Sequence, residues 1–258
     1  MTLRKFTFIL LALVLAAPCL CLYAEPIPSS STPLGTTAIN ADSIQALKNM
    51  GAYLQTLTRF QVKLILSSEV VLEDGQKLQQ SSEAEIQVQR TNKLRALMRS
   101  ARSERELVYD GKTVTIYTPA LKYYSRTETA STIVGMEKQL EEKYGLQLPF
   151  SDLFSWGTDA APLDQIESAM NAGQDFIDQE LCDHYAFRQG SIDWQIWISV
   201  GKKPLPRKIV ITSRADEARP QSVYLLTWNL KPTFQDSVFK FTPPKDAYPI
   251  GIRPLNTK

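Results

Sequence analysis

Apolar and polar residues alternate from residue 60 to residue 89, with a break at Asp74 and Gly75. The apolar members of the pattern share one parity and are Phe60, Val62, Leu64, Leu66, Val70, Leu72, Leu78, Ala84, Ile86 and Val88. A period of two places alternate side chains on opposite faces of a strand, so one face is apolar and the other is polar. Asp-Gly is a preferred turn between two such strands. The pattern therefore predicts a long β-hairpin.

Each arm of this hairpin is more than ten residues long, about twice the usual strand length of five or six residues. Long strands twist strongly, and the sheet they form tends to curl. A sheet that curls around its apolar face forms a hydrophobic trough. The rest of the sequence offers no convincing catalytic chemistry, so we expect the function to lie in what this trough holds.

Three segments outside the hairpin have apolar residues at helical spacing. They are Ile44, Leu47, Met50, Leu54 and Leu57; Ile133, Met136, Leu140 and Tyr144; and Leu163, Ile166 and Met170. Spacings of three and four residues place these side chains on one face of a helix. Asn40 or Asp42 is available to cap the first helix, and glycines follow the other two. We expect the helices to cover the sheet. The alternative is that those between residues 131 and 173 plug or gate the trough.

The remaining patterns predict strands that complete the sheet. They lie at 107–109, 113–118, 123–124, 175–181, 184–189, 192–200, 207–213, 222–230 and 238–241. Asp110 and Gly111 form a second hairpin turn between the first two of these strands. Trp197 is an apolar residue on a polar strand face. We expect a helix or loop to cover it, and an interaction surface is the alternative.

The N-terminus has the pattern of a secretory signal peptide. Arg4 and Lys5 precede an uncharged run from Phe6 to about Leu22, and Ala24 is a small residue before the expected cut. We therefore predict that residues 1–24 are removed on export to the periplasm. The uncharged run is shorter than the roughly 18 apolar residues of a membrane anchor, which disfavours an uncleaved helix.

The rest of the chain divides into three predicted parts. Residues 25–40 contain prolines and consecutive serines without any periodic pattern, so we predict a flexible leader. Residues 41–250 are expected to form one domain, which is an ordinary length for a sheet-rich fold. Residues 251–258 are the expected C-terminal tail.

Charge and cysteine content exclude several classes of function. Without Arg4 and Lys5, 29 minus 2 leaves 27 basic residues against 27 acidic residues. A neutral chain has no basic field to attract phosphates, so we expect no nucleic-acid partner. Cys182 is the only cysteine left after residue 24, so an intramolecular disulfide is not available.

Cys182, Asp183 and the sole histidine, His184, are the only cluster that invites a catalytic or metal-binding interpretation. On a strand, Cys182 and His184 share one face and Asp183 points to the other, so the three do not converge. A zinc site needs three or four ligands, and a Cys-His pair needs an oxyanion site as well. We therefore expect no catalytic residue, no metal and no cofactor.

Several motifs resemble the DUF2092 family of predicted periplasmic proteins. They are the run from Arg105 to Lys112, the strand to Tyr117, Lys122-Tyr123-Tyr124, the segment from Gly145 to Leu153, the segment from Asp193 to Trp197, and the segment from Pro204 to Lys208. More distantly, the Asp-Gly-Lys turn and the ending from Asp236 to Pro244 are similar to the lipoprotein carriers LolA and LolB. This resemblance implies an α+β fold, an incomplete β-barrel whose strongly curved antiparallel sheet has helices packed on its concave face.

The residues and the resemblance together favour a monomeric, non-catalytic carrier or chaperone in the periplasm. We expect it to bind a lipid or the acyl chains of a lipoprotein and to exchange them with a donor or acceptor protein at a membrane. The expected hydrophobic-ligand-binding residues are Val62, Leu64, Leu66, Ile86, Val88, Ile133, Met136 and Leu140. The alternative is a periplasmic sensor or envelope-assembly factor that binds a protein with the same fold.

Overall fold

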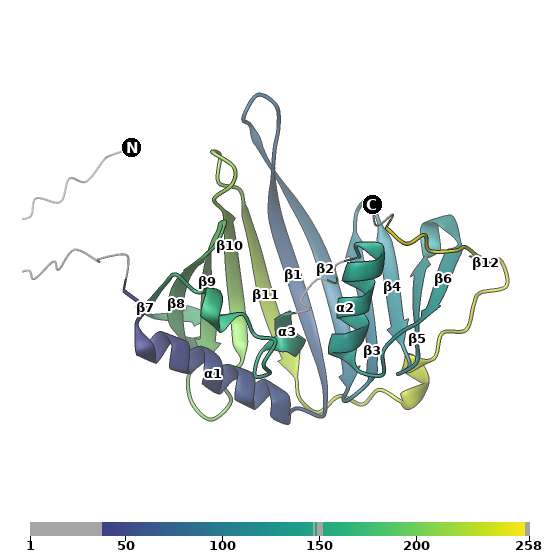
Figure 1. Cartoon of the computed structure of the whole chain (residues 1–258), viewed down its shortest axis with the longest axis horizontal. Coiled ribbons are helices and arrows are strands. Elements are labelled where there is room, and N and C mark those ends of the chain that lie inside the picture. Colours follow the sequence, from purple (N-terminus) through teal and green to yellow (C-terminus); the bar gives the residue numbers. More distant parts are fainter. Residues whose placement is uncertain (1–37, 147, 149–151, 256–258) are drawn as a thin grey trace, which may run out of the picture. The chain divides into compact units, whose positions relative to one another are not determined.

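Twelve strands form one curved sheet in the computed structural model, which describes residues 38–146, 148 and 152–255 (Figure 1). The strand order is β12-β6-β5-β4-β3-β2-β1-β11-β10-β9-β8-β7, and all neighbours are antiparallel except β12 and β6. The strands are β1 Arg59–Val71, β2 Lys77–Gln89, β3 Lys93–Ser100, β4 Glu104–Tyr109, β5 Thr113–Thr118, β6 Tyr123–Glu128, β7 Ser168–Ile177, β8 Glu180–Gln189, β9 Ile192–Ser199, β10 Pro206–Ser213, β11 Gln221–Asn229 and β12 Tyr248–Pro249.

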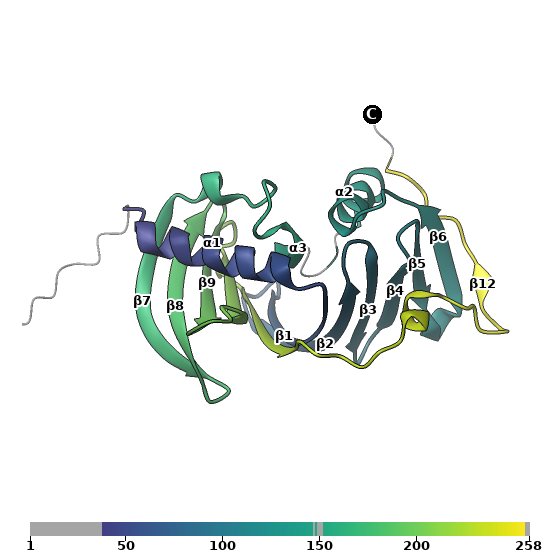
Figure 2. The same cartoon turned by 90° about the horizontal axis from the view of Figure 1, so that it is seen from below.

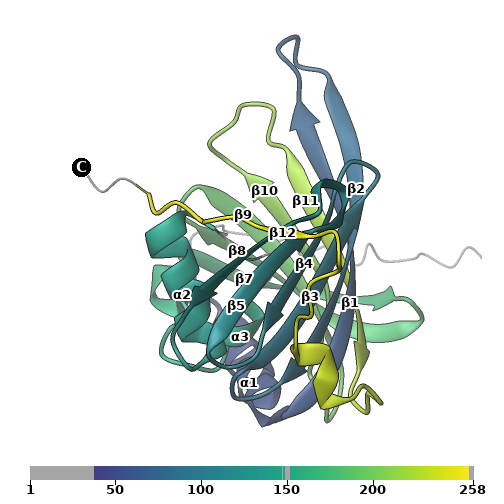
Figure 3. The same cartoon turned by 90° about the vertical axis from the view of Figure 1, so that its right-hand side faces the viewer.

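The helices α1 Ala41–Thr56, α2 Ile133–Tyr144 and α3 Asp152–Ser155 lie on the concave side of this sheet (Figures 2 and 3). α1 crosses the half of the sheet that contains β7, β8 and β9, whereas α2 lies beside β3 and β4. The short α3 contacts both α1 and α2. The expected fold, a curved antiparallel sheet with helices on its concave face, is confirmed.

Local sequence explains where the two long helices begin and end. The side chain of Asn40 accepts a hydrogen bond from the Ser43 backbone N–H at 2.8 Å and so caps α1. Thr132 caps α2 in the same way, and Gly145 ends α2 with a φ of 65°. That left-handed conformation suits glycine, which has no Cβ. The apolar faces of α1 and α2 bury Leu47, Met50, Leu54, Ile133, Met136 and Leu140.

The predicted long hairpin is confirmed as β1 and β2, which have thirteen residues each. β11 pairs with β1 only as far as Ser68, and β3 pairs with β2 only from Ser82. The hairpin beyond these residues projects past its neighbouring strands as a two-stranded ribbon (Figure 1). On the ribbon, Val70 lies directly opposite Leu78, and both side chains are exposed. The predicted alternation therefore holds along the arms, but the tip has nothing to pack against.

Several parts of the secondary structure differ from the sequence-based expectation. The predicted helix through Leu163, Ile166 and Met170 is wrong, because a 3-10 turn at Leu163–Gln165 leads directly into β7. β7 pairs along its length with β8, and this non-local pairing overrides the helical spacing. The predicted strand at 238–241 is wrong too, since Asp236–Phe239 is a 3-10 turn. The predicted strand at 175–181 is wrong as well, because a turn at Asp178 and Gln179 divides this segment between β7 and β8. The pattern analysis did not predict β3, β12 or α3.

The predicted signal peptide and most of the predicted leader, up to residue 37, lie outside the described residues. Within the described part of the chain, no helix is both long enough and apolar enough to span a membrane.

Candidate functional site

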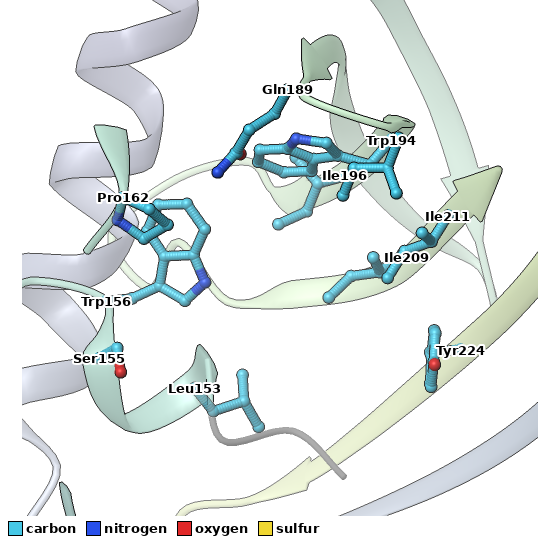
Figure 4. A pocket seen from close by; sticks show the side chains of 11 residues that line it. Leu153, Ser155, Trp156, Pro162, Gln189, Trp194, Ile196, Ile209, Ile211 and Tyr224 are labelled. Atoms are coloured by element: carbon cyan, nitrogen blue, oxygen red, sulfur yellow. The ribbon is translucent and has the colours of Figure 1, made fainter. Parts of the chain in front are cut away.

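A cavity of about 280 Å³ lies between the sheet and the segment that contains α3 (Figure 4). Its lining residues are Leu153, Ser155, Trp156, Pro162, Gln189, Ile192, Trp194, Ile196, Ile209, Ile211 and Tyr224. The lining is largely apolar, and the polar groups of Ser155, Gln189 and Tyr224 lie among aliphatic and indole side chains. A cavity of this kind suits a hydrophobic ligand that has a small polar part.

The floor of the cavity is set by the register of β9, β10 and β11. Trp194 pairs with Ile211 across β9 and β10, and Ile196 pairs with Ile209 in the same way. Ile209 in turn lies opposite Tyr224 of β11. Directly opposed residues point to the same face of a sheet, so these five side chains form one continuous surface.

Stacked aromatic rings form one wall of the cavity. The ring of Trp194 stacks on that of Phe187 from β8, with centroids 4.3 Å apart. The ring centroid of Trp156 lies 6.0 Å from that of Trp194, with an angle of 48° between the two rings. Figure 4 shows Trp156 and Trp194 close to each other among the residues that line the cavity. Both indoles are therefore placed to report on anything that enters the cavity.

The segment that covers the cavity is seated on α1 through a backbone contact between two glycines. A Cβ added to Gly51 would lie 2.5 Å from the Gly157 nitrogen, and a Cβ on Gly157 would lie 2.4 Å from the Gly51 oxygen. No residue other than glycine fits this approach. Gln55, one turn along α1, adds a hydrogen bond from its Nε2 to the Trp156 carbonyl at 2.6 Å. These contacts fix Trp156 over the cavity.

Arg90 ties the end of α1 to the sheet and to the other two helices. Its Nη1 donates to Gln55 Oε1 at 3.0 Å, and its guanidinium lies 5.8 Å from the ring centroid of Phe154. Burial lowers the pKa of Arg90, and the charge of the buried Glu137 on α2 opposes that shift. Arg90 therefore interacts with Gln55 of α1, Glu137 of α2 and Phe154 of α3.

Seven of the eight expected ligand-binding residues lie in the hydrophobic core, and the structure brings them together. Val62, Leu64, Ile86, Val88, Ile133, Met136 and Leu140 are at most 3% exposed, whereas Leu66 is half-buried. They belong to the same buried cluster as several cavity residues, but none of them lines the cavity. The side chains of Val62, Leu64, Ile86 and Val88 on β1 and β2 are almost completely buried, so that part of the concave face is filled.

The cavity residues were not proposed as a site from the sequence. Ile209 and Ile211 flank Val210 in an uninterrupted apolar run, so alternation does not show which side chains face inward. The aromatic connection around Trp156 was visible in the sequence, but its position over the sheet depends on the contact between Gly51 and Gly157. The alternation of Trp194 and Ile196 with polar residues was the clearest sequence feature that could have indicated the cavity lining.

Cys182 and His184 lie on the other face of the sheet, away from the cavity. The Cys182 thiol is fully buried, and burial raises its pKa to about 11. His184 Nε2 is 2.9 Å from Gln195 Oε1, and the imidazole stacks on Trp197 with centroids 4.0 Å apart. A buried, protonated thiol and an imidazole engaged in this way are poor candidates for a nucleophile and its base. Within the described ranges, no three His, Cys, Asp or Glu side chains are grouped to hold a metal ion.

Trp197 is covered by neighbouring side chains rather than by the expected helix or loop. His184 of β8 and Lys208 of β10 flank it, and Lys208 Nζ lies 4.4 Å from its ring centroid. Trp197, Cys182 and Val210 form a small second core on this face. The indole is therefore only 5% exposed, which does not suit an interaction surface.

Comparison with known families gives one match that spans most of the chain. Residues 43–253 match the model of DUF2092, described as a predicted periplasmic protein. No curated protein matches the sequence.

Solved structures with similar arrangements have low sequence identity to this chain. An uncharacterised conserved protein from Thermus thermophilus is 11% identical with a TM-score of 0.48, and the match covers 80% of this chain and 99% of that protein. LprF from Mycobacterium bovis is 13% identical with a TM-score of 0.43, covering 82% and 100%. A LolA superfamily protein from Nitrosomonas europaea is 12% identical with a TM-score of 0.40, covering 79% and 99%.

Proposed function

The chain belongs to the DUF2092 family of predicted periplasmic proteins, and on this premise we propose that it is a non-catalytic carrier that holds a hydrophobic ligand in the cavity under Trp156. The supporting observation is an apolar cavity of about 280 Å³ beneath a segment seated on a glycine contact. Burial of each methylene of an acyl chain contributes about 0.8 kcal/mol, so an acyl chain binds without many polar contacts.

We also propose that residues 1–24 are a signal peptide that directs export, because a carrier between membranes works in the periplasm. So does exchange with a donor or acceptor protein, since a buried chain needs an accepting surface when it leaves. We further propose that the seven buried residues among the eight expected from the sequence extend the site, with Leu66 at its edge. They are continuous with the cavity in one cluster, so displacement of α2 would expose them to a longer ligand.

The proposal is tested by filling the cavity. Ile209→Trp places an indole into the space without adding a charge, and Ile65→Trp is the matched control because Ile65 is 55% exposed on the opposite face. Each protein is purified from a bacterial periplasm without detergent, and its organic extract is analysed by mass spectrometry. We expect a stoichiometric lipid with the unchanged protein and with Ile65→Trp, and its loss with Ile209→Trp. Circular dichroism verifies that both variants are folded. A lipid retained by folded Ile209→Trp would contradict the proposed site.

A second candidate function, binding of a protein partner, is favoured by the β1–β2 ribbon. Val70, Leu72 and Leu78 are 37–41% exposed on a ribbon that has no neighbouring strand, while the interior under α2 is filled. A sensor or assembly factor would use such an apolar projection. If no lipid is enriched in any sample, this function becomes the better account, and Val70→Ser with Leu78→Ser should then weaken the interaction.

A further inference from the structure

Exposed apolar side chains gather at the end of the sheet that β6 and β12 form. They are Leu121, Tyr123, Tyr248, Ile250 and Leu255, and each is 43–63% exposed. Figure 1 shows β6 and β12 at the outer end of the sheet, with the segment that follows β12 running back toward α2. Neighbouring large apolar groups that stay exposed mark a binding surface for a protein or a membrane.

Backbone hydrogen bonds hold three of these side chains side by side. Tyr248 lies directly beside Tyr123 in the parallel pairing of β12 with β6. The Tyr248 N–H donates to the Lys122 carbonyl, and the Ile250 N–H donates to the Tyr124 carbonyl, both at 2.8 Å. Tyr248 and Ile250 are therefore fixed along β6 by main-chain contacts, which leave their side chains free for another partner.

Leu255 extends this surface to the end of α2. Its N–H donates to the Lys143 carbonyl at 2.8 Å. Its side chain lies against Gly145, where an added Cβ would be 3.2 Å from Leu255 Cδ1. Together the five apolar residues form one surface, the C-terminal edge, which runs from the last strands of the sheet to α2.

The C-terminal edge has an excess of basic residues, although basic and acidic residues balance in the chain after residue 24. Residues 119–126 and 242–255 contain the basic residues Lys122, Arg126, Lys245 and Arg253 and one acidic residue, Asp246. Asp246 Oδ2 pairs with Lys122 Nζ at 2.5 Å. Among the described residues, Lys245 and Arg253 form no ion pair, and both are exposed. The edge therefore presents uncompensated positive charge next to its apolar side chains.

Two other exposed apolar sites have acidic neighbours instead. At the tip of the β1–β2 ribbon, residues 69–78 contain three acidic residues and one basic residue. Phe176 of β7 is 67% exposed at the opposite end of the sheet, and residues 175–180 around it contain three acidic residues and no basic residue. Exposed apolar groups and positive charge thus coincide at the C-terminal edge but not at these two sites.

We propose that the C-terminal edge docks on the surface of a bilayer that contains anionic phospholipids. Tyrosine suits the boundary between water and membrane, because its ring is apolar and its hydroxyl group is polar. Peripheral binding is strengthened by buried apolar area and by the attraction of basic residues to anionic lipids. The inference goes beyond the proposed function, since none of the five apolar residues lines the cavity.

Vesicle flotation tests this docking. One set of vesicles contains phosphatidylglycerol and phosphatidylcholine in equal amounts, and the other contains phosphatidylcholine alone. We expect the unchanged protein to bind the anionic vesicles at least tenfold more tightly. Raising the salt concentration should weaken this binding, because salt screens exposed charges.

A first pair of variants tests the apolar part of the edge. Tyr248→Ser combined with Ile250→Ser should weaken binding to the anionic vesicles at least tenfold, because less apolar surface leaves water on docking. The backbone hydrogen bonds of both residues do not need the side chains, and circular dichroism verifies the fold. Phe176→Ser is the matched control, since it removes an equally exposed aromatic ring from the other end of the sheet. It should bind like the unchanged protein.

A second pair of variants tests the charge. Lys245→Gln combined with Arg253→Gln should weaken binding to the anionic vesicles at least tenfold, since each basic residue near an anionic surface contributes to the attraction. Lys202→Gln combined with Lys203→Gln changes the net charge equally at two exposed residues between β9 and β10. This control should retain the binding.

Equal binding to both kinds of vesicle, or binding to neither, would overturn the inference. Equal losses in the edge variants and their controls would do the same. Sedimentation velocity adds one more check: a dimer that Tyr248→Ser with Ile250→Ser dissociates would make the edge an interface between two copies of the chain. Ile209→Trp should bind vesicles like the unchanged protein, so failure of docking and failure of the proposed cavity function are distinguishable.

Discussion

Gly51 of α1 and Gly157, which follows α3, meet backbone to backbone, so that a Cβ on Gly157 would lie 2.4 Å from the Gly51 oxygen. Gly157 also has a φ of 80°, which residues with a Cβ rarely adopt. Two glycines about a hundred positions apart thus fix the segment that covers the cavity. Their contact joins the amphipathic helix α1 to the candidate site.

Gly157→Ala should lower the free energy of unfolding by about 1–3 kcal/mol from backbone strain alone, and by more because of the clash with Gly51. Gly173→Ala is the matched control, since Gly173 has a φ of 100° and no atom within 4 Å of its added Cβ. Urea denaturation measures both variants. Equal losses for the two alanines would show that the glycine contact contributes nothing.

Trp156→Ala should open the cavity and weaken ligand binding at least tenfold, because the indole covers the bound tail and its removal re-exposes apolar surface. Stability should change little beyond about 1–2 kcal/mol, since Trp156 is only half-buried. Ligand titration and thermal unfolding give the two quantities. Trp156→Phe should retain most of the affinity, and an unaltered affinity in Trp156→Ala would place the ligand elsewhere.

Arg90→Met should lower the free energy of unfolding by about 1–3 kcal/mol, because the buried Glu137 carboxylate then lacks the favourable charge of the half-buried Arg90. The variant also loses the hydrogen bond from Arg90 to Gln55 Oε1. The double variant Arg90→Met with Glu137→Met should recover part of this loss, since the buried carboxylate is then removed together with the guanidinium. A double-mutant cycle in urea measures the coupling. Strictly additive effects would mean that Arg90 and Glu137 do not interact.

The pKa of His184 should lie below its ordinary value of 6.5, because burial disfavours the charged imidazolium. The hydrogen bond with Gln195 opposes this shift, so Gln195→Leu should lower the pKa further, whereas Lys208→Met should raise it by removing a positive charge. His184 is the sole histidine, and NMR follows its single imidazole signal. A pKa above 6.5 would contradict the described burial.

This pKa has a consequence for stability. The unfolded chain binds the proton at higher pH than the folded protein does, so stability falls as the pH drops below about 6.5. The contribution is fully present above that pH. His184→Gln should remove this part of the pH dependence in urea denaturation between pH 7 and pH 5, and an unchanged pH dependence would exclude His184 as its source.

The sequence by itself determined the elements whose pattern is local. Alternation on both sides of Asp74 and Gly75 specified the β1–β2 hairpin, because register and face follow from a period of two and a turn. Helical spacing after Asn40 specified α1. The DUF2092 motifs pointed to the family, and the family match confirms it. In each case, residues close together in the sequence are enough to predict the feature.

Only the tertiary structure decided which part of the apolar face is filled and which part is hollow. Val62 and Ile209 both lie on the concave face of the sheet, yet Val62 is completely buried while Ile209 lines a cavity. The same long-range pairing turned the segment around Met170 into a strand with β8 as its partner. A cavity is the space that distant side chains leave between them, so no local period encodes it. Its position depends on the volumes and contacts of residues such as Gly51 and Gly157, which come together only in the fold.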